Sequence, residues 1–79
     1  MENNKPAFEK RLGHIRVAIW RNTTDGKAWH NVSITRQYKD KNDDQWHDAS
    51  TFNGLADLAL VAECVGLARG WIMTQETQA

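Results

Sequence analysis

The chain has one cysteine, no cluster of glycines and no long apolar run, and each of these absences excludes a class of protein. Among its 79 residues only Cys64 is a cysteine, so an internal disulfide is impossible. A structural zinc site needs about four Cys, His or carboxylate ligands at set spacings, and Cys64 has no second Cys or nearby His. The usual supports of domains this small are disulfides, a structural metal or oligomerisation. We therefore expect oligomerisation.

Membrane and export signals are also missing. No apolar run reaches the roughly 18 residues that span a bilayer, and residues 1–11 are polar, unlike a signal peptide. These features predict a cytoplasmic protein with no membrane partner.

Patterns for catalysis or cofactor binding are absent as well. Cys64 falls among Leu and Val, which is typical of a small core residue rather than a nucleophile. The acidic run 40–44 resembles the start of an EF-hand loop, but Gln45 and Thr51 stand where that loop needs Gly and Glu. The three histidines have no ligating spacing: His14, His30 and His47. We expect no enzyme, no metal or other cofactor and no small-molecule substrate.

Alternating residues, many of them β-branched, predict a curved antiparallel sheet of three to four strands. Residues 14–22 and 29–39 are the two long strands, and Asp25-Gly26 between them suits a tight hairpin turn. Residues 46–52 form a weaker third strand, with Trp46 expected to be buried, and 8–12 a short strand before a glycine bend.

Residues 53–72 are rich in Leu, Ala and Val and predict one C-terminal helix, with Asn53 as a candidate N-cap. This is an α+β fold over residues 8–73, between an N-terminal arm (1–7) and a C-terminal tail (74–79). On a helical wheel, one apolar stripe holds Leu58, Val61, Val65 and Ile72, and a second holds Leu60, Cys64, Leu67 and Trp71. One sheet face needs only one stripe. We assign the second stripe to the interface of a helix-mediated homodimer.

The outward side of the two long strands carries aromatic, basic and hydrogen-bonding residues: Arg16, Trp20, Trp29, Asn31, Ser33, Thr35 and Gln37. Bases stack on aromatic rings for about 1–3 kcal/mol each while Lys and Arg contact phosphates. This surface is typical of single-stranded nucleic-acid binding. A stabilising cross-strand pair of Trp20 and Trp29 is an equally good interpretation of the two rings.

Charge is neutral overall but unevenly placed. Ten basic residues balance ten acidic ones, yet residues 1–36 are net positive and residues 37–79 net negative. Neutrality disfavours non-specific polyanion binding, while the positive first half restores a basic surface on the predicted sheet.

The order of elements resembles the single-strand-binding fold of the positive cofactor four coactivators and the Whirly proteins. The residues that carry the resemblance are Gly13-His-Ile-Arg16-Val-Ala-Ile-Trp20 and Arg36-Gln-Tyr38-Lys39-Asp40. The chain is also similar to small bacterial proteins with an Ile-Trp-x-Asn strand end and a Tyr-Lys-Asp turn leading to Trp, here Ile19 to Asn22 and Tyr38 to Trp46. The similarity spans roughly residues 8–72.

This resemblance implies a homodimer joined through its helices, with DNA on the exposed sheet faces and strand tips. The contacts that it implies are Lys10 and Arg11 at the bend, Arg16, Trp20, Trp29, Arg36 and Lys39, with Asn31 as a polar neighbour. The chain departs from the family at the acidic Asp43, Asp44 and Asp48, which stand where a basic strand tip would help to bind phosphate. Strand alternation also puts Arg36 on the inward side with Val32 and Ile34 unless a bulge intervenes.

The leading hypothesis is therefore a dimeric, non-catalytic protein that binds single-stranded DNA or RNA. The rival is a protein interaction module that docks a partner on its Trp-rich sheet face or edge, which the neutral net charge favours. Salt separates the two, because phosphate contacts weaken steeply as salt rises and apolar contacts hardly change.

Overall fold

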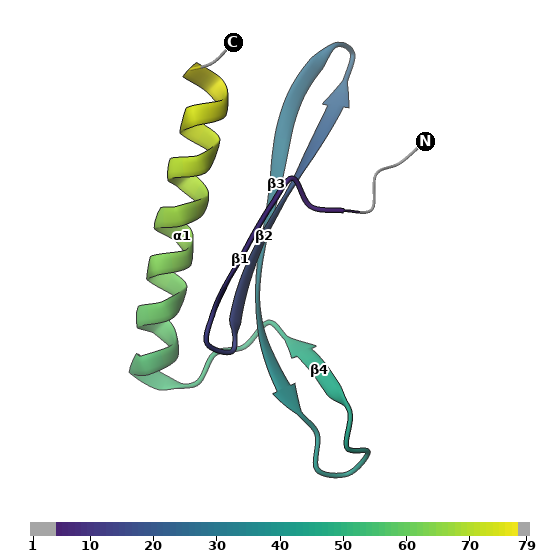
Figure 1. Ribbon diagram of the computed structural model, residues 1–79, viewed down its shortest axis with the longest axis vertical. Coiled ribbons are helices and arrows are strands. Elements are labelled where there is room, and N and C mark those ends of the chain that lie inside the picture. Colours follow the sequence, from purple (N-terminus) through teal and green to yellow (C-terminus); the bar gives the residue numbers. More distant parts are fainter. Residues whose placement is uncertain (1–4, 78–79) are drawn as a thin grey trace.

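The computed structural model describes residues 5–77 and has four antiparallel strands followed by one helix (Figure 1). The strands are β1 (Phe8–Leu12), β2 (Ile15–Thr24), β3 (Lys27–Lys39) and β4 (Trp46–Ala49), and the helix is α1 (Gly54–Thr77). They lie in the order β1-β2-β3-β4 in one sheet. The predicted α+β class, the short first strand and the C-terminal helix are confirmed.

Two glycine turns fix the register of the sheet. Asp25 and Gly26 have φ angles of 54° and 78°, the pair of positive values that a type I′ hairpin requires. This turn pairs Thr24 with Lys27, and the register continues without a bulge to Ile15 opposite Arg36. Gly13, with φ of 61°, turns β1 into β2. Because no residue is inserted, strand alternation holds along the whole of β2 and β3.

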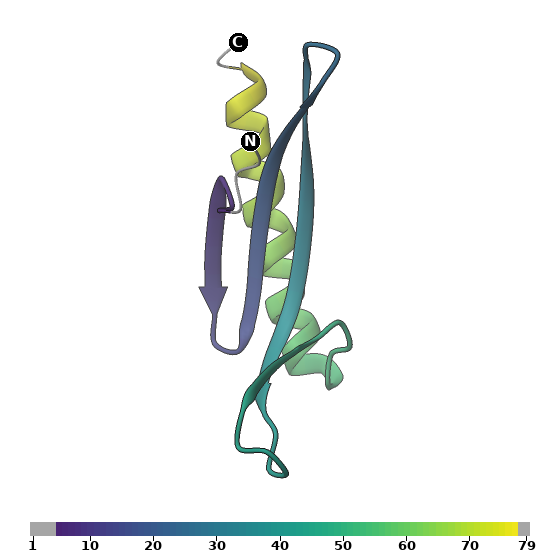
Figure 2. The ribbon, with the colours of Figure 1, turned by 90° about the vertical axis from the view of Figure 1, so that its right-hand side faces the viewer.

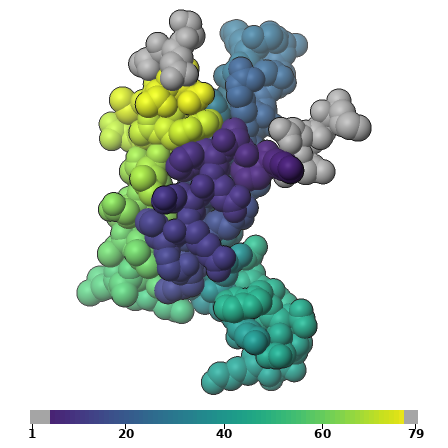
Figure 3. Space-filling view, in the orientation of Figure 1, coloured from purple at the N-terminus to yellow at the C-terminus, as the bar shows by residue number. Residues whose placement is uncertain are grey.

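The core lies between α1 and one side of the sheet. Ile15, Val17 and Ile19, alternate residues of β2, have no exposed surface. They pack against Cys64 and Ala68 of α1. We call this the helix-facing side and the opposite side the outward face. α1 runs along the sheet to near the level of the β2–β3 turn, whereas the hairpin of β3 and β4 extends past the start of the helix (Figures 1 and 3).

The stripe that α1 buries is the one that we assigned to a second copy. Cys64 is fully buried, and Leu60 and Trp71 pack against the same core cluster. Trp71 stacks on Phe8 with ring centroids 5.4 Å apart and meets His30 edge-on at 5.6 Å. Leu67 is half-buried. The assignment of this stripe to a dimer interface is therefore corrected, since α1 is apolar on several sides and its wheel alone does not show which side meets the sheet.

The other stripe is divided between the core and the surface, since Val61 and Ile72 pack against the core cluster. Leu58 and Val65 are about half exposed, as is Met73, one residue beyond the predicted helix end. The helix continues to Thr77, so residues 74–77 belong to α1 and not to a tail. In the N-terminal arm, the Ala7 N–H already donates to the Ile19 carbonyl at 2.7 Å; residues 1–4 and 78–79 of the predicted arm and tail lie outside the described part. Within residues 5–77, α1 lacks the apolar length needed to cross a bilayer.

Asp57 fastens the first turn of α1 to the sheet. Its buried carboxylate accepts the Asn53 backbone N–H at 2.8 Å and contacts His14 Nε2 at 2.7 Å. His14 lies in the turn between β1 and β2, so one side chain joins the helix start to the sheet. The Asn53 hydrogen bond and the nearby His14 hold the pKa of Asp57 below its ordinary value of 3.8.

We expect Asp57→Asn to lower the free energy of unfolding at neutral pH. A carboxyl whose pKa is lower in the folded state stabilises the fold above its unfolded value, and that contribution is lost as pH falls through the folded pKa. The difference from wild type should therefore shrink as pH falls below about 3.8. Urea unfolding followed by circular dichroism, at neutral pH and at a pH below the folded pKa of Asp57, measures this difference in the free energy of unfolding. The control is Asp48→Asn, which removes an exposed carboxylate from β4. Equal effects of the two substitutions at neutral pH would contradict this role of Asp57.

Candidate nucleic-acid interface

The outward face of the sheet has no second layer over it among the described elements (Figures 1 and 2). Strand alternation and the register decide which side chains lie on it. Its members are Glu9, Arg11, Arg16, Ala18, Trp20, Asn22, Thr24, Lys27, Trp29, Asn31, Ser33, Thr35, Gln37, Lys39, Trp46 and Asp48. This set includes six of the eight predicted contacts.

Three of the four tryptophans lie on this face. Trp46 is 65% exposed and Trp29 is 45% exposed, whereas Trp20 is partly covered. The prediction that Trp46 is buried is wrong, because it pairs with Lys39 at the outward side of β4, beyond the end of α1. β4 has only four residues, and so short an alternation in the sequence does not reveal which side of the strand faces the core. The aromatic surface is consequently larger than the sequence indicated.

Trp20 and Trp29 are diagonal neighbours and do not face each other directly. Trp20 pairs with Asn31 and Trp29 pairs with Asn22. The Trp29 indole N–H donates to Thr24 Oγ1 at 3.2 Å. The ring contacts identified within residues 5–77 join Phe8 to Trp71, His30 to Trp71 and Tyr38 to His47, and none joins Trp20 to Trp29. The geometry thus gives little support to a purely structural pair.

Basic residues accompany the rings. Arg11 and Arg16 are opposite each other across β1 and β2, and Lys27 and Lys39 lie at the two ends of β3. Two of the four are partly neutralised, since Arg16 forms an ion pair with Glu9 and Lys39 Nζ lies 3.2 Å from Asp44. The face is therefore basic, but only moderately so.

Lys10 and Arg36 are not on this face. Lys10 pairs with Val17 on the helix-facing side, and both it and Arg11 lie within β1 rather than at the bend. Arg36 also lies on the helix-facing side, opposite Ile15. Its guanidinium donates to the Thr51 carbonyl at 2.8 Å and lies 5.2 Å from the centre of the Tyr38 ring. Arg36 therefore holds the segment before α1 against β3, and we no longer count it or Lys10 as contacts on the face.

Together the rings and cations form a track along β3. Trp29 and Lys39 are ten residues apart on that strand, which at about 3.3 Å per residue corresponds to about 33 Å. Trp20 lies beside one end of the track, Trp46 beside the other, and Arg11 and Arg16 lie at the level of Thr35 between them. This arrangement can offer ring surfaces at both ends and positive charge between them.

The turn between β3 and β4 is acidic. The ligand atoms of Asp40, Asp43 and His47 all lie within 4.8 Å of one another. Asp43 Oδ1 accepts the Gln45 N–H at 2.9 Å, and this bond, with the contact to His47, lowers the pKa of Asp43. The sequence reasoning considered only an EF-hand here and missed His47, four residues after Asp43. Such a trio could hold a divalent cation, although exposed acidic groups often gather without one.

Comparison with known proteins finds no matching family model, no matching curated protein and no matching solved structure.

The environments of the tryptophans lead to opposite expectations for stability. Trp29→Ala and Trp46→Ala remove exposed rings and should change the free energy of unfolding by about 0.5 kcal/mol or less. Trp71→Ala removes a ring that is packed on Phe8 and the core, and should cost about 2 kcal/mol or more. Chemical denaturation of the three variants tests this. A loss at Trp29 as large as that at Trp71 would show that the outward ring is structural.

Proposed function

We propose that the protein binds single-stranded nucleic acid, DNA in the first instance, on the outward face of its sheet and without catalysis. The observation that carries the proposal is the placement of Trp20, Trp29 and Trp46 on one uncovered sheet face together with four basic residues. Exposed aromatic rings on a sheet lose no packing when a base stacks on them. The resemblance to the positive cofactor four and Whirly fold points to the same surface.

Stacking explains why single strands fit and duplexes do not. A ring on a sheet face can contact only a base that has left its neighbour, and each such stack contributes about 1–3 kcal/mol with little sequence preference. A track of about 33 Å is of the length that several nucleotides of an extended strand cover. Asn31, Ser33 and Thr35 add hydrogen-bonding groups along it.

The electrostatic contribution in this proposal is modest. Arg11 has no carboxylate partner among the described ion pairs, and Arg16 would have to leave Glu9 to meet a phosphate. Few phosphate contacts mean a shallow dependence of affinity on salt, because each contact adds about 0.7 to the logarithmic slope for single strands. We expect affinity to depend on the rings more than on charge.

The second candidate is a protein interaction module on the same face. It is favoured by the neutral net charge and by the two ion pairs that already occupy Arg16 and Lys39. Trp and Arg are also the residues enriched at protein interfaces. In that case the rings would contact side chains of a partner, and nucleic acid would cause no change in their fluorescence.

The homodimer also belongs to the proposal. With Leu60, Cys64 and Trp71 buried in the core of their own chain, the support for a dimer comes from the exposed apolar side of α1, at Leu58, Val65 and Met73. A chain of 79 residues with few buried side chains gains stability by covering such a surface.

The decisive test is titration of intrinsic tryptophan fluorescence with an oligothymidine at low salt, repeated at higher salt and with a duplex of equal length. We expect saturable quenching that is stronger for the single strand. Trp20→Ala and Trp46→Ala should each weaken binding by about 5- to 150-fold, the equivalent of one lost stack, while leaving the assembly state unchanged. If no nucleic acid quenches the fluorescence, the nucleic-acid proposal is wrong and the outward face is better explained as a docking surface for a protein partner.

A matched pair of arginine variants separates the two sides of the sheet. Arg11 lies on the outward face and Arg21 on the helix-facing side, and both are exposed. Arg11→Ala should weaken binding and reduce the salt slope by about one contact, whereas Arg21→Ala should do neither. Equal losses would mean that binding follows net charge and not the proposed face.

A further inference from the structure

β3 has a long edge with no partner strand. Its neighbour on one side is β2, which pairs from Lys27 to Arg36, whereas β4 pairs only with residues 36–39 on the other side. Among the described residues, no backbone hydrogen bond outside the regular elements reaches residues 27–35 on that other side. Nine residues of β3 therefore form an open sheet edge, beside α1 (Figure 2).

The register identifies the backbone groups at this edge. The Gln37 N–H donates to the His14 carbonyl, and Lys27 closes the hairpin with Thr24, so the odd-numbered residues of β3 direct their backbone groups toward β2. The even-numbered residues direct theirs away from it. The open edge thus presents the N–H and C=O groups of Ala28, His30, Val32 and Ile34.

This edge lacks the features that usually keep a sheet edge from pairing. Protein edges are commonly protected by charged residues, proline or bulges. The opposite edge of the sheet follows that rule, since three of the five residues of β1 are charged. From Ala28 to Thr35, by contrast, β3 has no charged residue, no proline and no bulge.

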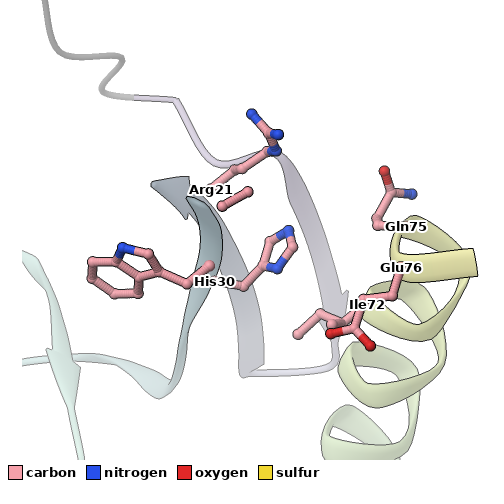
Figure 4. A pocket seen from close by; sticks show the side chains of 7 residues that line it. Arg21, His30, Ile72, Gln75 and Glu76 are labelled. Atoms are coloured by element: carbon pink, nitrogen blue, oxygen red, sulfur yellow. The ribbon is translucent and has the colours of Figure 1, made fainter. Parts of the chain in front are cut away.

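A groove follows the open edge on its helix-facing side. Its first part, a hollow of about 620 Å³, has a mixed lining, polar at Arg21, His30, Gln75 and Glu76 and apolar at Ala28 and Ile72 (Figure 4). A second hollow of about 410 Å³ adjoins it and shares Ile72 and Glu76. The second hollow is lined by Val32, Val65, Ala68, Arg69, Ile72, Met73 and Glu76. A strand added to β3 would therefore cover apolar side chains as well as form backbone hydrogen bonds.

We propose that the open edge of β3 pairs antiparallel with the same edge of a second copy, so that two four-stranded sheets join into one sheet of eight strands. Antiparallel pairing of a strand with itself about a two-fold axis is self-complementary, as a closed dimer requires. The middle of the open edge is Asn31, next to Val32, which lines the same hollow as Val65 and Met73. A two-fold axis at the level of Asn31 can therefore relate the two β3 strands and also the two α1 helices.

A second copy fits this surface better than an isolated peptide. Val65 and Met73 lie symmetrically about Arg69, so an axis near Arg69 packs Val65 of one copy against Met73 of the other. A peptide strand would form backbone hydrogen bonds with the open edge of β3 but would leave Val65 and Met73 of α1 exposed. The same axis brings Arg69 of the two copies close together, and Glu76, which lines the same hollow, supplies opposite charge nearby. This interface differs from one made by helices alone, because β3 contributes main-chain hydrogen bonds.

The joined sheet also extends the proposed binding face. With the axis near Asn31, Trp29 of each copy lies opposite Ser33 of the other, so the two tracks become continuous on the outward side. This consequence rests on the proposed function. The pairing itself deepens the proposed homodimer, does not depend on nucleic-acid binding and is tested without nucleic acid.

The test combines molecular mass with hydrogen exchange of the full chain. Analytical ultracentrifugation should give twice the mass of 9.0 kDa at micromolar concentration. In that dimer the amides of Ala28, His30, Val32 and Ile34 should exchange at least tenfold more slowly than in a monomeric variant. A dimer in which these four amides exchange at the monomer rate, or a monomer at every concentration, would overturn the proposal.

Two variants and their controls locate the interface. Val65→Glu places a charge in the groove, and Val32→Pro removes an N–H that has no partner within one chain, so each should give a folded monomer by circular dichroism. Leu55→Glu, at a residue 86% exposed and outside the groove, and Glu9→Pro, on the opposite edge, should remain dimeric. A dimer that withstands Val32→Pro, or one that both controls disrupt, would contradict pairing through β3.

Discussion

The structure depends on one contact, the packing of β2 against the middle of α1. Ile15, Val17 and Ile19 are fully buried beneath α1, and they lie on β2, which pairs along its whole length with β3 and over its first five residues with β1. β1 and β3 take their positions from β2 through backbone hydrogen bonds, and β4 takes its position from β3. Asp57 and Arg36 then fasten the segment between sheet and helix. Most side chains outside this contact are partly or fully exposed.

A single helix on a single sheet leaves three surfaces open. Strand alternation sends every second residue of β2 and β3 to the side that no element covers, and at these positions the chain has Trp, Arg and small polar residues. β3 is much longer than β4, so its backbone groups before residue 36 are unpaired on that side. The apolar surface of α1 is wider than the sheet covers, so Leu58, Val65 and Met73 stay exposed. The first surface suits a ligand that stacks, whereas the other two adjoin and suit a strand with a helix beside it. The two kinds of contact therefore need not compete for the same residues.

Local patterns in the sequence predicted most of the fold, and they were wrong where the answer depended on tertiary packing. Asp25-Gly26 and the alternation of β2 and β3 were sufficient for the hairpin and its register, because turn chemistry and strand period are properties of neighbouring residues. The alternation of side chains along β3 was sufficient to place Arg36 on the helix-facing side. The buried stripe of α1 could not be found in this way, since Leu58 and Leu60 are equally apolar and only the sheet distinguishes them. Trp46 was misplaced because four residues of strand provide too little alternation to define a side.

The distribution of charge shows how these surfaces differ. β1, the opposite edge of the sheet, has Glu9, Lys10 and Arg11, and charged side chains at an edge make pairing with another strand costly. The equally accessible edge of β3 has none between Ala28 and Thr35, although the chain has as many charged residues as an ordinary protein and places several in the turns at both ends of that strand. Solubility alone would favour charge at such an edge. An uncharged edge beside the hollow that Val65 and Met73 line is instead what the proposed pairing of two copies requires, and it leaves the basic residues on the outward face, where a polyanion could use them.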